Sequence, residues 1–251
     1  MDVWEQGAAY ERYIGRWSRR MTPEFVHWIG AAPGARWLDV GCGTGALTEA
    51  ILQVAQPSRV VGIDPSPGFI DHTKDAFDDR RVSFQVGNAM QLDFEAGVFD
   101  VAAAALVVNF VPEPLQAVKE MRRVSRTVAA YFWDYAGEMR LLRYFFDAAA
   151  EVDPGGREHD EGIRFKWCNP DGLRELFESA GLRDIEVRPL ISHMEFRDFD
   201  DYWNPFLGGQ GPAPAYAMSL DEGTRARLRD LLRSRVPLKF DSRAWAIKGK
   251  A

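Results

Sequence analysis

The stretch from Arg36 to Leu52, RWLDVGCGTGALTEAIL, constrains the fold of this chain more than any other. An apolar run that carries one acid, Asp39, breaks into three alternate glycines, Gly41, Gly43 and Gly45, and then resumes at helical spacing. Glycine is unfavourable inside both strands and helices, so three together mark a tight turn from strand to helix. Such a turn points backbone N–H groups and the positive end of a helix at whatever lies over it. The stretch therefore predicts a ligand-binding loop.

Short apolar runs rich in Val and Ile alternate with amphipathic stretches through the first half of the chain. The apolar runs predict strands at residues 35–40, 58–64, 82–87, 99–106 and 127–135. Helices are predicted after Gly45, after the capping pair Ser66-Pro67, and over the stripe that ends at Val124. Strands that alternate with helices are typical of a parallel sheet covered on both faces.

The second half has a different pattern. A helix with its own cap and stop is predicted over 169–181, and strands over 184–196 and 244–250. Two longer excursions, 136–168 and 197–235, are rich in aromatic residues, and we expect loops at 154–162 and 198–216 within them. The box Ser219-Leu-Asp-Glu222 predicts the start of a last helix. We expect the two excursions to lie together as a lid over the substrate.

Composition narrows the class of protein. The formal charge is −6, so the net charge of the chain does not attract a nucleic acid. No apolar run is long enough to cross a membrane. The N-terminus lacks the layout of a signal peptide. Two cysteines, Cys42 and Cys168, form neither a disulfide framework nor a metal cluster. We expect a cytoplasmic protein that binds no metal and is a monomer or a homodimer.

The glycine motif alone leaves two cofactor classes open. GCGTGA, from Gly41, satisfies the dinucleotide fingerprint, and Asp64 ends the second strand where an acid accepts hydrogen bonds from ribose, so an NAD(P)-dependent oxidoreductase fits. Asp39 favours another ligand, because a carboxylate near the loop repels a pyrophosphate and attracts a cation. Asn88, after the third strand, carries an amide that pairs with the edge of a purine.

These residues carry a resemblance to a known family. LDVGCGTGALT, VVGIDPS, FQVGNAMQLDF and FDVAAAALVVNFVPEP resemble the successive motifs of class I S-adenosylmethionine-dependent methyltransferases, most closely the small-molecule, type 11-like subgroup. The resemblance covers about Arg36 to Tyr135. It implies a Rossmann-like sheet of seven strands, mostly parallel, with an antiparallel last strand and a lid formed by insertions. The chain would be a single domain (1–251) with an N-terminal helical cap (1–34), a cofactor-binding core (35–135) and the two excursions as insertions.

The resemblance also implies roles for residues. Asp39 and the Gly41 backbone would serve the methionine ammonium of S-adenosylmethionine, Asp64 the ribose, and Asn88 with its neighbours the adenine. The glycines would then admit the methionine part of the cofactor. The full set of implied cofactor residues is Tyr13, Arg16, Asp39, Gly41, Cys42, Gly43, Gly45, Asp64, Pro65, Asn88, Ala89, Met90, Ala105 and Leu106.

The N-terminal segment YERYIGRW admits two interpretations. Tyr10, Tyr13 and Trp17 fall on one helical face, which favours simple packing. In the resembling family such a segment often folds over the cofactor, and Arg16 would pair with its carboxylate.

No residue stands out as a general base. The family commonly has His where this chain has Asn109, and usually Asp where it has Asn88. The remaining catalytic candidates are His159, in a predicted loop, and Tyr135, which with Asp134 ends the fifth strand. For His27, His72 and His193 we expect packing or surface roles.

The sequence thus predicts S-adenosylmethionine-dependent methyl transfer to a small-molecule acceptor, with S-adenosylhomocysteine as product. The motifs do not identify the acceptor or its nucleophilic atom, which is O, N, C or S. The alternatives are the oxidoreductase and a non-catalytic, cofactor-binding partner subunit.

Overall fold

The computed structural model describes residues 11–209 and 211–251. Contacts between residues divide the chain into two compact units. Unit 1 holds the described residues up to Trp17, then Trp133–Cys168 and Ile191–Ala244. Unit 2 holds Ser18–Phe132, Asn169–Leu190 and Trp245–Ala251. Two of the predicted insertions fall in unit 1, and the glycine-rich loop falls in unit 2.

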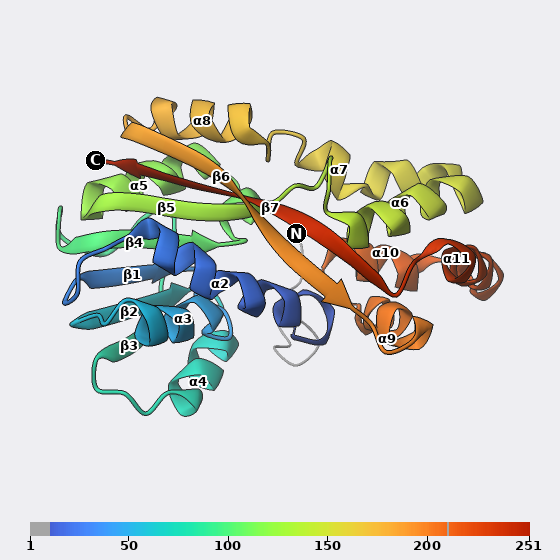
Figure 1. The fold of residues 1–251 in the computed structure, drawn as a ribbon, viewed down its shortest axis with the longest axis horizontal. Coiled ribbons are helices and arrows are strands. Elements are labelled where there is room, and N and C mark those ends of the chain that lie inside the picture. The colour runs from blue at the N-terminus through green and yellow to red at the C-terminus, as the bar shows by residue number, and fades with distance from the viewer. Residues whose placement is uncertain (1–10, 210) are drawn as a thin grey trace. The chain divides into compact units, whose positions relative to one another are not determined.

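The described residues form strands, α-helices and short 3₁₀ or π helices (Figure 1). The strands are β1 (Arg36–Val40), β2 (Arg59–Asp64), β3 (Val82–Val86), β4 (Phe99–Ala105), β5 (Ser125–Trp133), β6 (Arg183–Glu195) and β7 (Lys239–Lys250). The α-helices are α2 (Arg16–Ile29), α3 (Ala46–Val54), α4 (Pro67–Ala76), α5 (Pro114–Val124), α6 (Arg140–Val152), α7 (Glu161–Arg164), α8 (Pro170–Ser179), α9 (Phe199–Trp203), α10 (Pro212–Ser219) and α11 (Glu222–Arg235). The short helices are η1 (Glu11–Gly15), η2 (Val108–Phe110), η3 (Pro154–His159) and η4 (Asn204–Gly208).

The strands form one seven-stranded sheet in the order β3-β2-β1-β4-β5-β7-β6. Figure 1 shows the first five of these stacked in that order, and they pair in parallel. The last strand is antiparallel, so the predicted fold is confirmed. Leu38 and Asp39 of β1 pair with both β2 and β4, which places this strand at the centre of the parallel part. Ligands of open parallel sheets bind beyond the carboxyl ends of such central strands.

Local signals in the sequence set the ends of several helices. Ser66 caps α4 by accepting a hydrogen bond from the backbone N–H of Phe69, as predicted. Asn169 caps α8 through two backbone N–H groups, and Gly181 with φ 82° follows its end. The predicted cap of the last helix is wrong. Asp221 caps α11 by accepting from the N–H of Thr224, because its side chain stands one residue before the first helical turn.

The two predicted loops of unit 1 are largely helical. Residues 154–164 form η3 and α7, and residues 199–219 form α9, η4 and α10, with Gln210 outside the described residues. Aromatic packing supports these short helices: Phe206 of η4 stacks on Phe145 of α6 at 4.5 Å between ring centroids. Helices of this length are marginal alone, so tertiary contacts rather than propensity hold them.

The two aromatic excursions pack against each other within unit 1. Arg235 of α11 pairs with Glu151 of α6 at 2.5 Å, and the Tyr216 hydroxyl donates to Asp153 at 2.9 Å. The Tyr202 hydroxyl is buried and donates to the carbonyl of Leu141 at 3.1 Å. That this body acts as a lid stays a prediction. None of the helices in the described part of the chain is long and apolar enough to span a bilayer.

Candidate cofactor site

The glycine-rich loop connects β1 to α3 in unit 2. All three glycines have positive φ: 73° at Gly41, 49° at Gly43 and 84° at Gly45. L-residues rarely adopt this region, so the loop needs glycine at each position. The N–H groups of Gly41 and Cys42 both donate to the carbonyl of Ile63, at 2.8 and 2.9 Å, which ties the loop to the end of β2.

The three glycines differ in what faces them. A Cβ at Gly41 would meet Val107 at 2.5 Å, and one at Gly45 would meet Phe77 at the same distance. A Cβ at Gly43 would meet no atom of the described residues within 4 Å. Gly41 therefore makes room for the segment after β4, and Gly45 makes room for the end of α4. Open space for a ligand lies over Gly43.

Asp39 lies at the centre of the sheet with none of its surface exposed. Its Oδ2 accepts a hydrogen bond from the Thr48 hydroxyl at 2.7 Å, and its Oδ1 is buried with no hydrogen-bond partner in the described part of the chain. Burial raises the pKa of this carboxyl to about 7, hydrogen bonds from Thr48 oppose that rise, and the charge of Asp64 adds to it. A buried carboxylate oxygen without a partner is costly, and a ligand cation would satisfy it.

Asp64 is also buried but has both oxygens occupied. Oδ1 accepts from the N–H of Ser66 at 2.9 Å, and Oδ2 accepts from the N–H of Gly43 at 3.1 Å. Burial raises the pKa of Asp64, and these two backbone hydrogen bonds lower it. The carboxylate thus links the end of β2 to the open side of the glycine-rich loop, and each oxygen keeps lone pairs for ribose hydroxyls.

The expected adenine residues follow β3 and β2. Asn88 is exposed, and its Oδ1 accepts from the N–H of Met90 at 2.9 Å, which leaves its amide N–H groups pointing to no acceptor that the described residues are recorded to offer. Ala89 is buried, and Pro65 is exposed just beyond Asp64. The N–H of Gly87 donates to the carbonyl of Asp64 at 3.0 Å, which places the Asn88 turn beside the β2 end.

The end of β4 completes this group of residues. Leu106 has φ 60°, a conformation that is strained for a branched side chain. Its N–H donates to the carbonyl of Tyr131 at 3.0 Å, and Val107 then lies against Gly41. Ala105 is partly exposed, whereas Asn109 is buried in η2. Strain at a strand end beside a ligand loop is typical of a binding site.

Cys42 does not offer its side chain to this space. It is buried with Ile70 and Phe84 in a small apolar cluster, and burial raises the pKa of its thiol. Only its backbone belongs to the loop. Both cysteines are free thiols.

Two residues of this region were not predicted. Thr48 holds Asp39, but a buried threonine in an amphipathic helix gave no sequence signal for that role. Arg19 of α2 reaches the glycine-rich loop, where its guanidinium donates to the Thr44 hydroxyl at 3.3 Å and pairs with Glu49 at 2.6 Å. The sequence places Arg19 in the N-terminal segment near Arg16, but it does not indicate that Arg19 contacts the glycine-rich loop.

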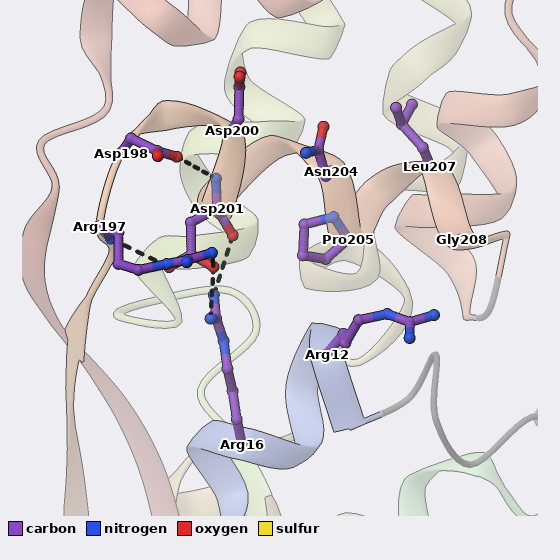
Figure 2. Close-up of a pocket in the computed structure, with 10 residues that line it drawn as sticks. All are labelled: Arg12, Arg16, Arg197, Asp198, Asp200, Asp201, Asn204, Pro205, Leu207 and Gly208. Carbon is purple, nitrogen blue, oxygen red and sulfur yellow. Dashed lines mark hydrogen bonds and ion pairs between the residues drawn. The ribbon is translucent and has the colours of Figure 1, made fainter.

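Tyr13 and Arg16 lie in unit 1, and Tyr10 lies outside the described residues. Tyr13 is buried, packs edge-on against Phe206 at 5.3 Å, and its hydroxyl finds no hydrogen-bond partner in the described residues. Arg16 pairs with Asp201 at 2.9 Å, as Figure 2 shows. This pair lines a pocket of about 860 Å³ that Arg12 and Arg197 also border. The cofactor roles of Tyr13 and Arg16 stay predictions.

The remaining candidates in unit 1 have mainly structural environments. His159 is exposed, and its ring lies 4.8 Å from that of Tyr216. Tyr135 is buried against Phe165 at 4.9 Å. Asp134 accepts from Arg243 at 2.6 Å and from the N–H of Glu138 at 2.9 Å, so it stabilises the chain after β5. A sequence signal was also absent for Glu161, which is a buried carboxylate near Tyr13.

The described residues contain no group of three or more His, Cys, Asp or Glu side chains that would hold a metal ion. His193 of β6 contacts the carboxylate of Asp241 at 2.6 Å.

The strand order, the antiparallel last strand and the glycine-rich loop after β1 define the class I methyltransferase fold. Residues 38–130 match the family model of the methyltransferase domain. This match and the methyltransferases similar to the chain support a class I S-adenosylmethionine-dependent methyltransferase. This assignment decides against the nicotinamide-dependent oxidoreductase that the glycine motif left open.

Similar proteins agree with the assignment. The chain is 26% identical over 205 residues to a demethylmenaquinone methyltransferase of Staphylococcus aureus, covering 74% of this chain and 83% of that protein. A putative methyltransferase from an antibiotic biosynthesis pathway of Anabaena variabilis has the same fold, with a TM-score of 0.66, 16% identity, and coverage of 94% and 100%. So does a phosphoethanolamine N-methyltransferase of Haemonchus contortus in complex with phosphomonomethylethanolamine and S-adenosylhomocysteine, with a TM-score of 0.59, 15% identity, and coverage of 97% and 56%.

Proposed function

We propose that this methyltransferase binds S-adenosylmethionine through unit 2 and transfers its methyl group to a small-molecule acceptor. The buried Oδ1 of Asp39 carries the cofactor part of the proposal. A carboxylate oxygen at the centre of the sheet, next to a loop whose open side lies over Gly43, fits an ammonium group. It does not fit a phosphate, which the same charge would repel.

Other residues of unit 2 bind the remaining parts of the cofactor. Asp64 accepts from the ribose hydroxyls, and the exposed amide of Asn88 meets the adenine edge, with Pro65 and Ala89 beside it. The N-terminus of α3 favours the cofactor's carboxylate. When bound, S-adenosylmethionine supplies an activated methyl group on a sulfonium.

The protein's own part in such a reaction is alignment and exclusion of water. The nucleophile must approach in line with the bond that breaks, so the acceptor has to be held rigidly. Unit 1 has a hollow of about 860 Å³, a size that admits a small molecule, and charged side chains such as Arg16, Arg197 and Asp201 make up much of its lining. Relatives named for demethylmenaquinone and for phosphoethanolamine act on small molecules, which supports the same acceptor class here.

The experiment is a transfer assay with S-adenosylmethionine labelled in its methyl group and a panel of small acceptors, including phenols, amines, thiols and activated carbons. We expect S-adenosylhomocysteine to form with at least one acceptor, and the label to appear in that acceptor. Asp64→Ala, assayed in parallel, should abolish most of the signal. Tight binding of S-adenosylhomocysteine with no transfer to any acceptor would favour the non-catalytic partner subunit instead.

A further inference from the structure

The first turn of α3 holds the acid at the centre of the cofactor site. Thr48 is fully buried, and its hydroxyl donates to Oδ2 of Asp39 at 2.7 Å. Thr48 is the third residue of α3, so the carboxylate lies beside the turn where helix N–H groups are unpaired. One oxygen of Asp39 is therefore fixed, and the other, Oδ1, is buried without a hydrogen-bond partner in the described residues.

The surroundings of Asp39 make its ionisation unfavourable without a ligand. It lies between Gly62 of β2 and Ala103 of β4, neither of which has a polar side chain. Among the described residues, the titratable groups coupled to it are the carboxyl of Asp64 and the thiol of Cys42. Neither supplies a positive charge. Burial accordingly raises the pKa of Asp39 to about 7, so near neutral pH the site holds a mixture of acid and carboxylate.

We propose that Thr48 is a positioning residue that fixes Oδ2 of Asp39, presents Oδ1 to the cofactor's ammonium, and thereby couples cofactor binding to the release of a proton. This inference rests on the proposed function of unit 2. When an ammonium ligand binds to protonated Asp39, a carboxylate–ammonium pair forms and the carboxyl proton passes to solvent. An ammonium partner stabilises the charged carboxyl, so affinity increases as pH rises through the titration of Asp39 and levels off above it.

The test is calorimetric titration of the full chain with S-adenosylhomocysteine between pH 5.5 and 8.5, with the proton release counted near pH 6.5 in phosphate and in imidazole. Because these buffers differ in ionisation enthalpy, the difference in observed heat counts the protons released. We expect affinity to fall by about tenfold per pH unit well below the titration of Asp39, with up to one proton released per ligand. 5′-Methylthioadenosine, which lacks the amino-acid part, should bind with no such pH dependence.

Variants separate positioning from mere packing. Thr48→Val keeps the shape and the backbone N–H bond to Asp39 but removes the hydroxyl donor. The midpoint of the pH profile should therefore move to higher pH, with affinity at pH 7 reduced by about three- to tenfold. Thr48→Ser should restore the wild-type profile. Asp39→Asn should bind weakly at every pH and release no proton. A purely structural Thr48 would instead lower affinity equally at all pH values in Thr48→Val.

The outcomes are distinct. Binding of S-adenosylhomocysteine that is independent of pH and releases no proton would overturn the coupling and leave the cofactor assignment intact. Superimposable pH profiles of the wild type and Thr48→Val would overturn the role of Thr48. No binding at any pH would contradict the proposed function itself.

Discussion

Asp39 in unit 2 and Asp134 in unit 1 are both buried aspartates at or just after a central strand, yet their surroundings are opposite. Asp134 is matched by the guanidinium of Arg243 and by a backbone N–H. Asp39 is hydrogen-bonded only by the hydroxyl and the backbone N–H of Thr48, and one of its oxygens has no partner in the described chain. A buried acid whose partners come from the protein stabilises the fold, whereas one that lacks them is unfavourable for folding and is ready for a ligand.

The largest expected effect is on stability at Asp39. Its folded-state pKa lies above the unfolded value, so the penalty for burying its charge is absent below about pH 4 and fully present above about pH 7. Asp39→Asn should therefore increase the free energy of unfolding of the cofactor-free protein at pH 8 by about 3 kcal/mol, and have little effect at pH 4.5. Urea denaturation at both pH values measures this. A destabilised Asp39→Asn at pH 8 would mean that the carboxylate has a partner in the free protein.

The reverse sign is expected at Asp134. Asp134→Ala leaves the guanidinium of Arg243 without its carboxylate and should lower the free energy of unfolding by about 2 kcal/mol. We expect no larger loss because Arg243 is one-third exposed, so solvent screens this ion pair. The same denaturation experiment at pH 7 measures it, with Asp134→Asn as a milder control. If Asp134→Ala were neutral for stability but weakened S-adenosylhomocysteine binding, the contrast between the two aspartates would fail.

The glycines give a matched pair of smaller effects. Gly45→Ala combines a positive φ with a Cβ 2.5 Å from the Phe77 ring, and should cost about 2 kcal/mol of stability. Gly43→Ala has the positive φ but open space, so it should cost about 1 kcal/mol and mainly impair cofactor binding. Thermal denaturation and calorimetric titration of both variants check this. Equal loss of binding in two equally stable variants would show that the space over Gly43 is not the ligand's.

The smallest effect is expected at His159. This side chain is exposed and packs on Tyr216, so His159→Ala should lower turnover by less than about tenfold, below the usual range for a lost general base. The assay is single-turnover methyl transfer to an acceptor found in the panel. A loss of a thousandfold or more with unchanged cofactor affinity would make His159 the base.

The parallel core and its loop were predictable because their signals are local. A strand that breaks into alternate glycines, and caps such as Ser66 and Asn169, dictate structure through a few neighbouring residues. The short helices between Phe199 and Ser219 were not predictable, since their order depends on ring contacts such as Phe145 with Phe206 that are distant in sequence.

The same limit applies to the site. The position of Asp39 beside the glycines predicted that it belongs to the site, but nothing in the sequence predicted its hydrogen bond with Thr48. In the sequence, a threonine on a buried helical face is only a polar residue that interrupts an apolar stripe. The contact between β1 and α3 in the folded structure shows that its hydroxyl donates to Asp39. Likewise, sequence could not tell that Arg16 pairs with Asp201.

The most direct test of the account is equilibrium titration of the wild type and Asp64→Ala with S-adenosylhomocysteine, and with NADH as the control ligand, followed by tryptophan fluorescence at pH 8. We predict that the wild type binds S-adenosylhomocysteine and not NADH, and that Asp64→Ala weakens this binding by about 2–3 kcal/mol while the variant stays folded, because two ribose hydroxyls lose a charged acceptor. Equal affinity in a folded Asp64→Ala, or binding of NADH in place of S-adenosylhomocysteine, would contradict the assignment of the cofactor to unit 2.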